Sequence, residues 1–187
     1  MSNKPKYILV HCTDVSQKVF DQFKSVNDYH ASQDFPLSSL GYFVGYHALI
    51  TGGKLRMTKE DWEEGAHCNN TVGGLSMNFQ SLAVCLGFDG DIEMPEQYMI
   101  PLMVGQIQEW QKKFGIPEEN VMFHRDFRKD KTCPGSLITR EWLLKQLANA
   151  KEEGQKAKMN DIVAQMNAMQ LLLDGLKRLL FERFGIK

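Results

Sequence analysis

The sequence predicts an α/β fold followed by a C-terminal amphipathic helix. Short apolar runs rich in β-branched and aromatic residues predict buried strands at residues 7–10, 81–88 and 121–123. Apolar residues that recur every three or four positions predict a helix within residues 96–114, and a second series with this spacing occupies residues 162–180. Strand and helix patterns therefore alternate along most of the chain, as expected of an α/β protein.

Length and composition limit the class of protein. A chain of 187 residues is long enough for one compact domain and an appendage, because domains average roughly 150 residues. Its apolar fraction of 43% provides for a sizeable core, which excludes a disordered chain. The formal charge of -1 argues against a protein built to neutralise many phosphates, so no nucleic acid is expected as a partner.

The first part of the chain carries signals for a strand, a helix and a hairpin. Residues 7–10 form a strand-like run that ends in the polar cluster 11–14, so polar groups are expected at the end of this strand. Residues 19–30 carry apolar residues at helical spacing. Residues 41–50 have a strand-like composition, and Gly52-Gly53 predict a tight turn into a second strand.

The remainder of the first 150 residues predicts a loop and two helices. Residues 60–74 are rich in turn formers and read as a long loop. The helix within residues 96–114 is expected to stop at Gly115. Residues 124–134 read as a polar loop, and a further helix is expected at 139–147.

The C-terminal segment differs in kind from the rest. Residues 151–187 hold seven basic and five acidic side chains, whereas residues 1–150 hold 15 basic and 18 acidic ones, and Gly154 suggests a flexible joint. We therefore expect a boundary near residue 150. The apolar seam of the last helix consists of Ile162, Met166, Met169, Leu173, Leu176 and Leu180. This seam predicts packing or self-association through residues 160–184, with membrane contact as the alternative.

Three residues have the chemistry of zinc ligands. His11 lies at the end of the first strand, His124 follows the last short strand, and Cys133 comes nine positions later. Zinc favours imidazole and thiolate, and a catalytic zinc site keeps three protein ligands and one open position. The distance of His11 from the other two along the chain favours a catalytic site over a structural zinc knuckle. The residue types alone leave an alternative open, namely that each is an ordinary buried His or Cys.

Several short motifs occur in a fixed order along the chain. They are Val10-His11-Cys12-Thr13, Gly45-Tyr46-His47, Gly65-Ala66-His67, Asn78 with the strand Ser81-Leu82-Ala83-Val84-Cys85-Leu86, Phe123-His124-Arg125-Asp126, and Lys131-Thr132-Cys133-Pro134. Together they resemble the type 2 N-acetylmuramoyl-L-alanine amidase family, which includes phage lysozyme-named amidases and the peptidoglycan recognition proteins. The resemblance covers about residues 5–147 and is specific only in the combination of motifs.

The resemblance implies a fold and a reaction. The fold is a mixed central β-sheet flanked by helices, with one Zn2+ in a cleft. The reaction is hydrolysis of the amide that joins the lactyl group of N-acetylmuramic acid to L-alanine. Residues 1–150 would then form the zinc amidase domain and residues 151–187 a C-terminal helical extension.

The resemblance also implies roles for individual residues. The positions that match the family's zinc ligands are His11, His124 and Cys133. The tyrosine and lysine that its phage amidases need for catalysis correspond to Tyr46 and Lys131. The family's cleft-lining histidine and asparagine correspond to His67 and Asn78, which would bind the muropeptide or, as the alternative, cap loops.

The chemistry of this set is coherent without the family. Two neutral imidazoles and one thiolate leave the zinc formally +1, enough to lower the pKa of bound water toward ~7. Lys131 is two residues from a ligand and can stabilise the oxyanion, which is typically worth ~3 kcal/mol. Tyr46 can donate a hydrogen bond to the same centre or help to protonate the leaving nitrogen. The sequence leaves the division of these two roles open.

Strand alternation and burial preferences give expectations for the neighbouring residues. Successive side chains of a strand point to opposite faces, so Cys12 is expected opposite the preceding histidine, as a core thiol, and His47 opposite Tyr46. Cys85 lies in an apolar strand and is expected in the core. Cys68 lies in a loop and is expected to be an exposed thiol.

The resulting hypothesis is a phage or prophage lysis enzyme that acts on peptidoglycan. The N-terminal segment lacks a signal peptide, so we expect the protein to be cytoplasmic when made and to act on the cell wall after release. One alternative is a non-catalytic muropeptide-binding module, although such binders are expected to lack the thiolate that Cys133 provides. Another is a zinc peptidase that cuts within the stem peptide.

Overall fold

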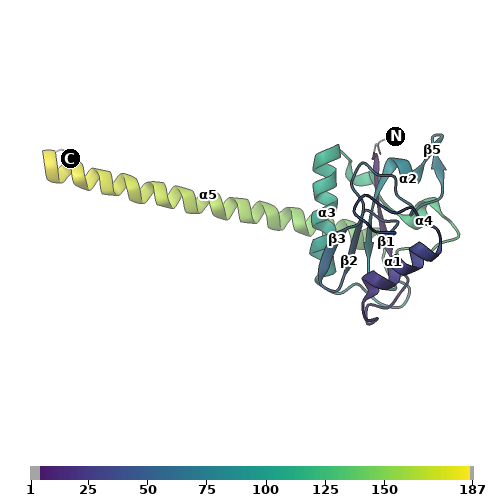
Figure 1. Cartoon of the computed structure of the whole chain (residues 1–187). Coiled ribbons are helices and arrows are strands. Elements are labelled where there is room, and N and C mark those ends of the chain that lie inside the picture. Colours follow the sequence, from purple (N-terminus) through teal and green to yellow (C-terminus); the bar gives the residue numbers. More distant parts are fainter. Residues whose placement is uncertain (1–4, 186–187) are drawn as a thin grey trace. The chain divides into compact units, whose positions relative to one another are not determined.

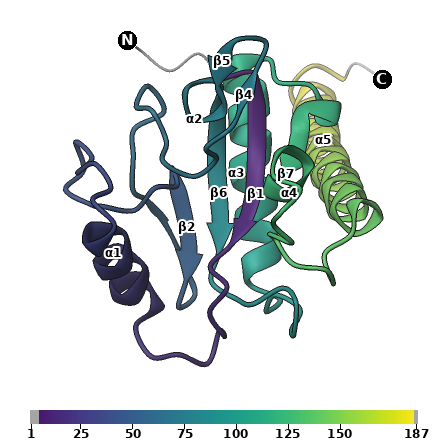
Figure 2. The same ribbon diagram turned by 90° about the vertical axis from the view of Figure 1, so that its right-hand side faces the viewer.

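The computed structural model describes residues 5–185 and contains a five-stranded mixed sheet. The strand order is β3-β2-β6-β1-β7, and Figure 2 shows β2, β6, β1 and β7 in this sequence across the sheet. The strands are β1 (Tyr7–Cys12), β2 (Ala48–Thr51), β3 (Lys54–Met57), β6 (Ser81–Leu86) and β7 (Val121–Phe123). Only the β2–β3 pair is antiparallel, because a tight turn joins these two strands. The mixed α/β fold predicted from the sequence is therefore confirmed.

Helices cover both faces of this sheet. Helix α1 (Gln22–Ser32) and helix α3 (Met99–Phe114) lie on opposite faces in both views (Figures 1 and 2). On the α1 face, Val26 packs with Leu49 of β2 and Cys85 of β6. The register aligns Cys85 with His11 of β1, so the α1 face is also the face that presents this histidine.

The bend before β2 departs from the predicted strand. Residues 41–50 were expected to be strand-like, but pairing begins only at Ala48. The preceding main chain bonds elsewhere: the Gly45 N–H donates to His30 Nδ1 (3.2 Å), and the Gly45 carbonyl accepts from the Ala66 N–H (2.8 Å). Any Cβ at position 45 would lie 2.4 Å from the Ala66 oxygen, so only glycine allows this approach. This bend positions Tyr46.

The predicted loop at residues 60–74 is mostly irregular but ends in a hairpin that the sequence analysis missed. Strands β4 (Thr71–Val72) and β5 (Leu75–Ser76) pair across Gly73 and Gly74, both with positive φ angles. Helix α2 (Met77–Gln80) follows. Cys68 is buried against Leu9 and Met77, so the expectation of an exposed thiol was wrong: the loop folds back over the sheet and contributes to its core.

The segment from α3 (Met99–Phe114) to the loop after β7 follows the sequence prediction closely. Helix α3 ends at Phe114, and Gly115 adopts a left-handed conformation with φ 67°. A short 3₁₀ turn, η1 (Glu118–Asn120), leads into β7. The expected polar loop begins with the short helix α4 (His124–Phe127).

The last helix, α5 (Arg140–Phe184), is continuous. Its backbone stays helical through Gly154, where the sequence suggested a joint. The chain divides into two compact units, one up to Leu143 and one from Leu144 onward. The seam residues of α5 are exposed, for example Leu173 at 48% and Leu176 at 55%. Among the helices of the described residues, none combines the length and the apolar character that a membrane span requires.

Candidate metal centre and active site

The fold brings His11, His124 and Cys133 together. Their potential ligand atoms all lie within 4.8 Å of one another. His11 is near the carboxyl end of β1, and His124 directly follows β7, the parallel neighbour of β1. Because carboxyl ends of parallel strands meet at the same edge of a sheet, the two imidazoles converge. Cys133 arrives on the loop after α4 and is buried.

Main-chain groups hold the cysteine at this position. The Cys133 sulfur accepts from the Cys12 N–H (3.4 Å) and lies 3.6 Å from His11 Nδ1. The Cys133 carbonyl accepts from the Arg125 N–H (3.0 Å), so the loop is tied to α4 directly after the histidine. The thiol is thus fixed beside the imidazole nitrogen that faces it.

Arg125 is a supporting residue to which sequence reasoning gave no role. Its guanidinium donates to the carbonyls of Thr132 (2.9 Å), Gly135 (2.6 Å) and Ile138, on both sides of Cys133. A planar guanidinium can satisfy several carbonyls at once, which a single ammonium does less well. The only sequence signal for this role is the position of an arginine directly after a candidate ligand.

The residues fit a metal ion. His124 Nε2 is the one buried side-chain nitrogen or oxygen without a hydrogen-bond partner among residues 5–185. Buried polar atoms without a partner are rare in folded proteins and call for an explanation, such as an ion. An imidazole nitrogen with no other partner, next to a second imidazole and a thiol, matches the ligand set that zinc prefers.

The environment keeps the two imidazoles neutral at pH 7. Burial lowers the pKa of His11 well below its usual value, and the neighbouring His67 and His124 lower it further. Burial also lowers the pKa of His124 to about 4, with the cationic Arg128 and Lys131 adding to this effect. Neutral imidazole is the form that binds metal ions, so both rings are in the protonation state that a metal ion requires.

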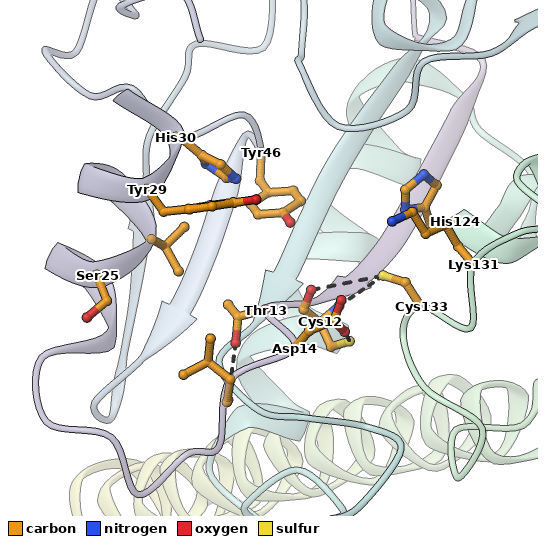
Figure 3. Close-up of a pocket in the computed structure, with 12 residues that line it drawn as sticks. Cys12, Thr13, Asp14, Ser25, Tyr29, His30, Tyr46, His124, Lys131 and Cys133 are labelled. Atoms are coloured by element: carbon orange, nitrogen blue, oxygen red, sulfur yellow. Dashed lines mark hydrogen bonds between the residues drawn. The ribbon is translucent and has the colours of Figure 1, made fainter. Parts of the chain in front are cut away.

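Tyr46 and Lys131 face the same cavity as the metal-ligand group. The cavity has a volume of about 430 Å³, and Figure 3 shows Tyr46 on one side of it and His124, Lys131 and Cys133 on the other. The Tyr46 ring lies 5.0 Å from the His11 ring, centroid to centroid. Burial raises the pKa of Tyr46 well above its usual value, and the thiols of Cys85 and Cys133 raise it further. Tyr46 is therefore a neutral hydrogen-bond donor at pH 7, and the exposed Lys131 supplies a cation.

His67 and Asn78 lie on the other side of His124. All three line a second cavity of about 280 Å³. His67 is buried, and its Nδ1 lies 3.2 Å from His11 Nε2. The Asn78 side-chain oxygen accepts from the N–H groups of His67 (2.9 Å) and Cys68 (2.7 Å). Asn78 thus caps this loop, as in the alternative that the sequence left open, and His67 contacts the candidate ligand His11.

The remaining expectations have mixed outcomes. Cys85 belongs to the core and His47 faces α3, with its ring 6.3 Å from the Trp110 ring, and both expectations are confirmed. Cys12 is buried as expected, but it also lines the larger cavity and its thiol donates to Asp14 (2.8 Å). The alternation of side chains between the two faces of a strand does not extend past Cys12, because β1 ends there and the chain turns at Asp14, which has φ 54°.

Comparisons with known proteins agree with this geometry. A family described as N-acetylmuramoyl-L-alanine amidase matches residues 1–136. A sequence comparison with curated proteins gives no match. Among solved structures, N-acetylmuramoyl-L-alanine amidase LysC from Clostridium intestinale URNW is similar, with a TM-score of 0.62, 18% identity, and coverage of 78% of this chain and 87% of that one.

Two further structures show the breadth of the similarity. The Ph2119 endolysin from Thermus scotoductus MAT2119 bacteriophage Ph2119 has a TM-score of 0.61 and 16% identity, with 79% of this chain and 87% of that chain covered. A mutant of Drosophila PGRP-LB in complex with tracheal cytotoxin has a TM-score of 0.57 and 22% identity, with 74% and 80% covered. At such identities, the similarity shows a shared fold.

Proposed function

The chain belongs to the N-acetylmuramoyl-L-alanine amidase family, and we propose that it is a zinc-dependent enzyme that hydrolyses the amide between N-acetylmuramic acid and L-alanine in peptidoglycan. The observation that carries the proposal is the convergence of His11, His124 and Cys133, in which one imidazole nitrogen has no hydrogen-bond partner. Two of these residues, His124 and Cys133, line the same cavity as Tyr46 and Lys131. The residues up to about 150 would form the amidase domain.

The proposed ligands are His11 Nδ1, His124 Nε2 and the Cys133 sulfur. The sulfur lies close to His11 Nδ1, and His124 Nε2 has no partner within the described residues. A zinc ion held there supplies a Lewis acid and a nucleophile derived from water at neutral pH. Two neutral imidazoles and a thiolate leave the centre cationic, which suits the addition of negative charge to an amide carbonyl.

Tyr46 and Lys131 are proposed to act on the amide itself. Tyr46 stays protonated because it is buried, so its hydroxyl would donate a hydrogen bond to the carbonyl oxygen as negative charge develops. The Lys131 ammonium would stabilise the same charge from the solvent side, and such stabilisation is typically worth ~3 kcal/mol. One water would be consumed: its oxygen bonds to the carbonyl carbon, a proton passes to the leaving nitrogen, and the C–N bond breaks, giving a free lactyl carboxylate and the α-amino group of L-alanine.

We also propose that the protein acts in phage or prophage lysis. The similar structures include a phage endolysin, and this chain carries both the tyrosine and the lysine that resemble those of phage amidases. The PGRP-LB complex contains tracheal cytotoxin, which supports a muropeptide as the bound partner. In this proposal the protein is made in the cytoplasm and acts on the wall after release.

Product analysis tests the function directly. Purified protein added to isolated sacculi should release new lactyl and L-alanine termini, identified by mass spectrometry, and should lose this activity with a chelator or with His124→Ala. Fragments cut within the stem peptide would instead identify a peptidase. Binding to sacculi without turnover, in protein shown to contain zinc, would identify a binding module.

A further inference from the structure

We propose that His67 is a positioning residue that fixes the orientation and tautomer of His11 for metal binding, in a hydrogen-bond relay that continues to Ser81. The proposal rests on the metal-binding function proposed above. The relay connects His11 Nε2 to His67 Nδ1 (3.2 Å) and His67 Nε2 to the Ser81 hydroxyl (3.5 Å). It starts from Nε2 of His11, whereas the cysteine faces Nδ1 of the same ring.

The partners at each end determine the direction of every hydrogen bond. His11 Nδ1 faces the Cys133 sulfur and needs a free lone pair to bind a metal, so the His11 proton must be on Nε2. His67 Nδ1 then accepts this N–H, and the His67 proton must be on Nε2, which points at Ser81. The Ser81 hydroxyl donates to the Met77 carbonyl, so toward His67 Nε2 its oxygen acts as the acceptor. One arrangement of protons satisfies all three side chains.

The surroundings hold His67 firmly in this relay. The two ring nitrogens of His67 face His11 and Ser81, so a ring with a single proton can accept at one nitrogen and donate at the other. The main chain at His67 is fixed by Asn78, whose side-chain oxygen accepts from its N–H. Gly65 leaves room for the ring, because a Cβ there would lie 2.3 Å from His67 Cδ2. The glycine of the Gly65-Ala66-His67 motif is therefore needed to make room for the imidazole ring of His67.

A neutral acceptor has a chemical consequence. Metal-bound histidines usually donate their second N–H to a carboxylate, a carbonyl or water, which fixes the ring and raises its basicity. Here the acceptor is an uncharged imidazole, so the relay orients His11 without adding a negative charge near the metal. A Zn2+ ion held by two neutral imidazoles and one thiolate would then keep its formal net charge of +1, which would favour addition of a nucleophile to an amide carbonyl.

Two substitutions of His67 test its two ring nitrogens one at a time. In His67→Asn the side-chain oxygen can replace Nδ1 and accept from His11, whereas in His67→Gln the amide replaces Nε2 and leaves His11 without its acceptor. We expect His67→Gln to bind zinc roughly 10- to 100-fold more weakly than wild type in competition with a chromogenic chelator. His67→Asn should remain within a few-fold of wild type.

Control measurements separate positioning from folding. His47→Gln removes another buried imidazole, which bonds to Glu63 and Ala83 rather than to His11, and should leave the zinc affinity unchanged. Urea unfolding of each zinc-free variant reports whether the substitution alters the fold, and Co²⁺ absorption bands report the ligand geometry. Similar zinc affinities for the Asn and Gln variants, or tighter binding by the Gln variant, would overturn the relay. A wild-type protein without zinc affinity would instead overturn the proposed function.

Discussion

His47 occupies a buried position beside β6 and α3, where both of its ring nitrogens have partners. Nδ1 accepts from the Ala83 N–H (3.1 Å), and Nε2 donates to the Glu63 carbonyl (3.1 Å). Only the neutral ring can make this pair of bonds. Burial lowers the pKa of His47 from 6.5 to about 4, with Glu63 and Asp61 opposing the shift in part.

This burial predicts a loss of stability in acid. Because the folded pKa is below the unfolded one, the unfolded state binds more protons between these values, and stability falls as the pH drops from 6.5 toward 4. From pH 7 to pH 5, His47 alone should account for about 2 kcal/mol of lost unfolding free energy. Urea titrations of zinc-free wild type and His47→Gln should differ by this amount in their pH dependence; parallel curves would contradict the assignment.

Tyr46 gives a second prediction for a single residue. Replacing it with phenylalanine removes the hydroxyl and leaves the ring that packs 5.0 Å from His11. We expect turnover of sacculi to fall by about 10²-fold or more, as on removal of one oxyanion donor, while zinc affinity stays unchanged. Turnover near the wild-type level would show that the hydroxyl takes no part in the reaction.

At the scale of elements, the loop that carries Cys133 depends on Arg125. Arg125→Met would leave the carbonyls of Thr132, Gly135 and Ile138 without their charged donor, a loss of about 1.5–3 kcal/mol for each bond of this kind. We expect weaker zinc binding, because the cysteine would no longer be held in place. Arg125→Lys should recover only part of the affinity.

A matched control is Arg56→Met on β3. The Arg56 guanidinium lies over the Phe23 ring, 4.3 Å from its centroid, rather than in the Cys133 loop. Calorimetric zinc titration of the three variants tests the prediction, and equal weakening by Arg56→Met would speak for a general loss of stability instead.

The last helix also has an element-scale prediction. Its seam residues follow one another at alternating steps of four and three, close to the 3.5-residue period that is typical of helices that pair with another helix, and they are exposed. We expect self-association through residues 160–184, detected by light scattering as a mass above the 21.4 kDa of one chain. Leu173→Lys with Leu176→Lys should return the protein to the monomer.

Leu171→Lys is the matched control for the seam. Leu171 is 74% exposed and lies outside the 3.5-residue repeat, so this substitution should leave self-association intact. A monomeric wild type that binds anionic vesicles would contradict the prediction and favour membrane contact.

Local patterns predicted some elements well and others poorly, for identifiable reasons. The strand around Val84 and the helix that ends at Gly115 were predicted because their apolar spacing and stop signal are local. The bend at Gly45 was missed because its hydrogen bonds go to His30 and Ala66, far along the chain. The contact of His67 with His11 was missed for the same reason: their separation of 56 residues leaves no local signal.

For the whole molecule, the metal should contribute to stability. In the proposed function zinc binds only the assembled site, so the folded state would gain about 2.7 kcal/mol when free zinc is at 100 times its Kd. We expect chelation to lower the Tm of the full-length protein and restored zinc to reverse the change. Because the ligands must be deprotonated, this gain should shrink at acidic pH. A Tm that does not respond to zinc would contradict a site formed by His11, His124 and Cys133.

The strand order has a consequence for how the protein is made. β1 precedes the other four strands of this sheet along the chain, yet it lies between β6 and β7, which are synthesised much later. His11 can therefore meet His124 and Cys133 only after Cys133 has been translated and β1 has taken its place inside the sheet. Chains that end before Cys133 lack one of the three candidate ligands, so the proposed metal centre can form only late in synthesis.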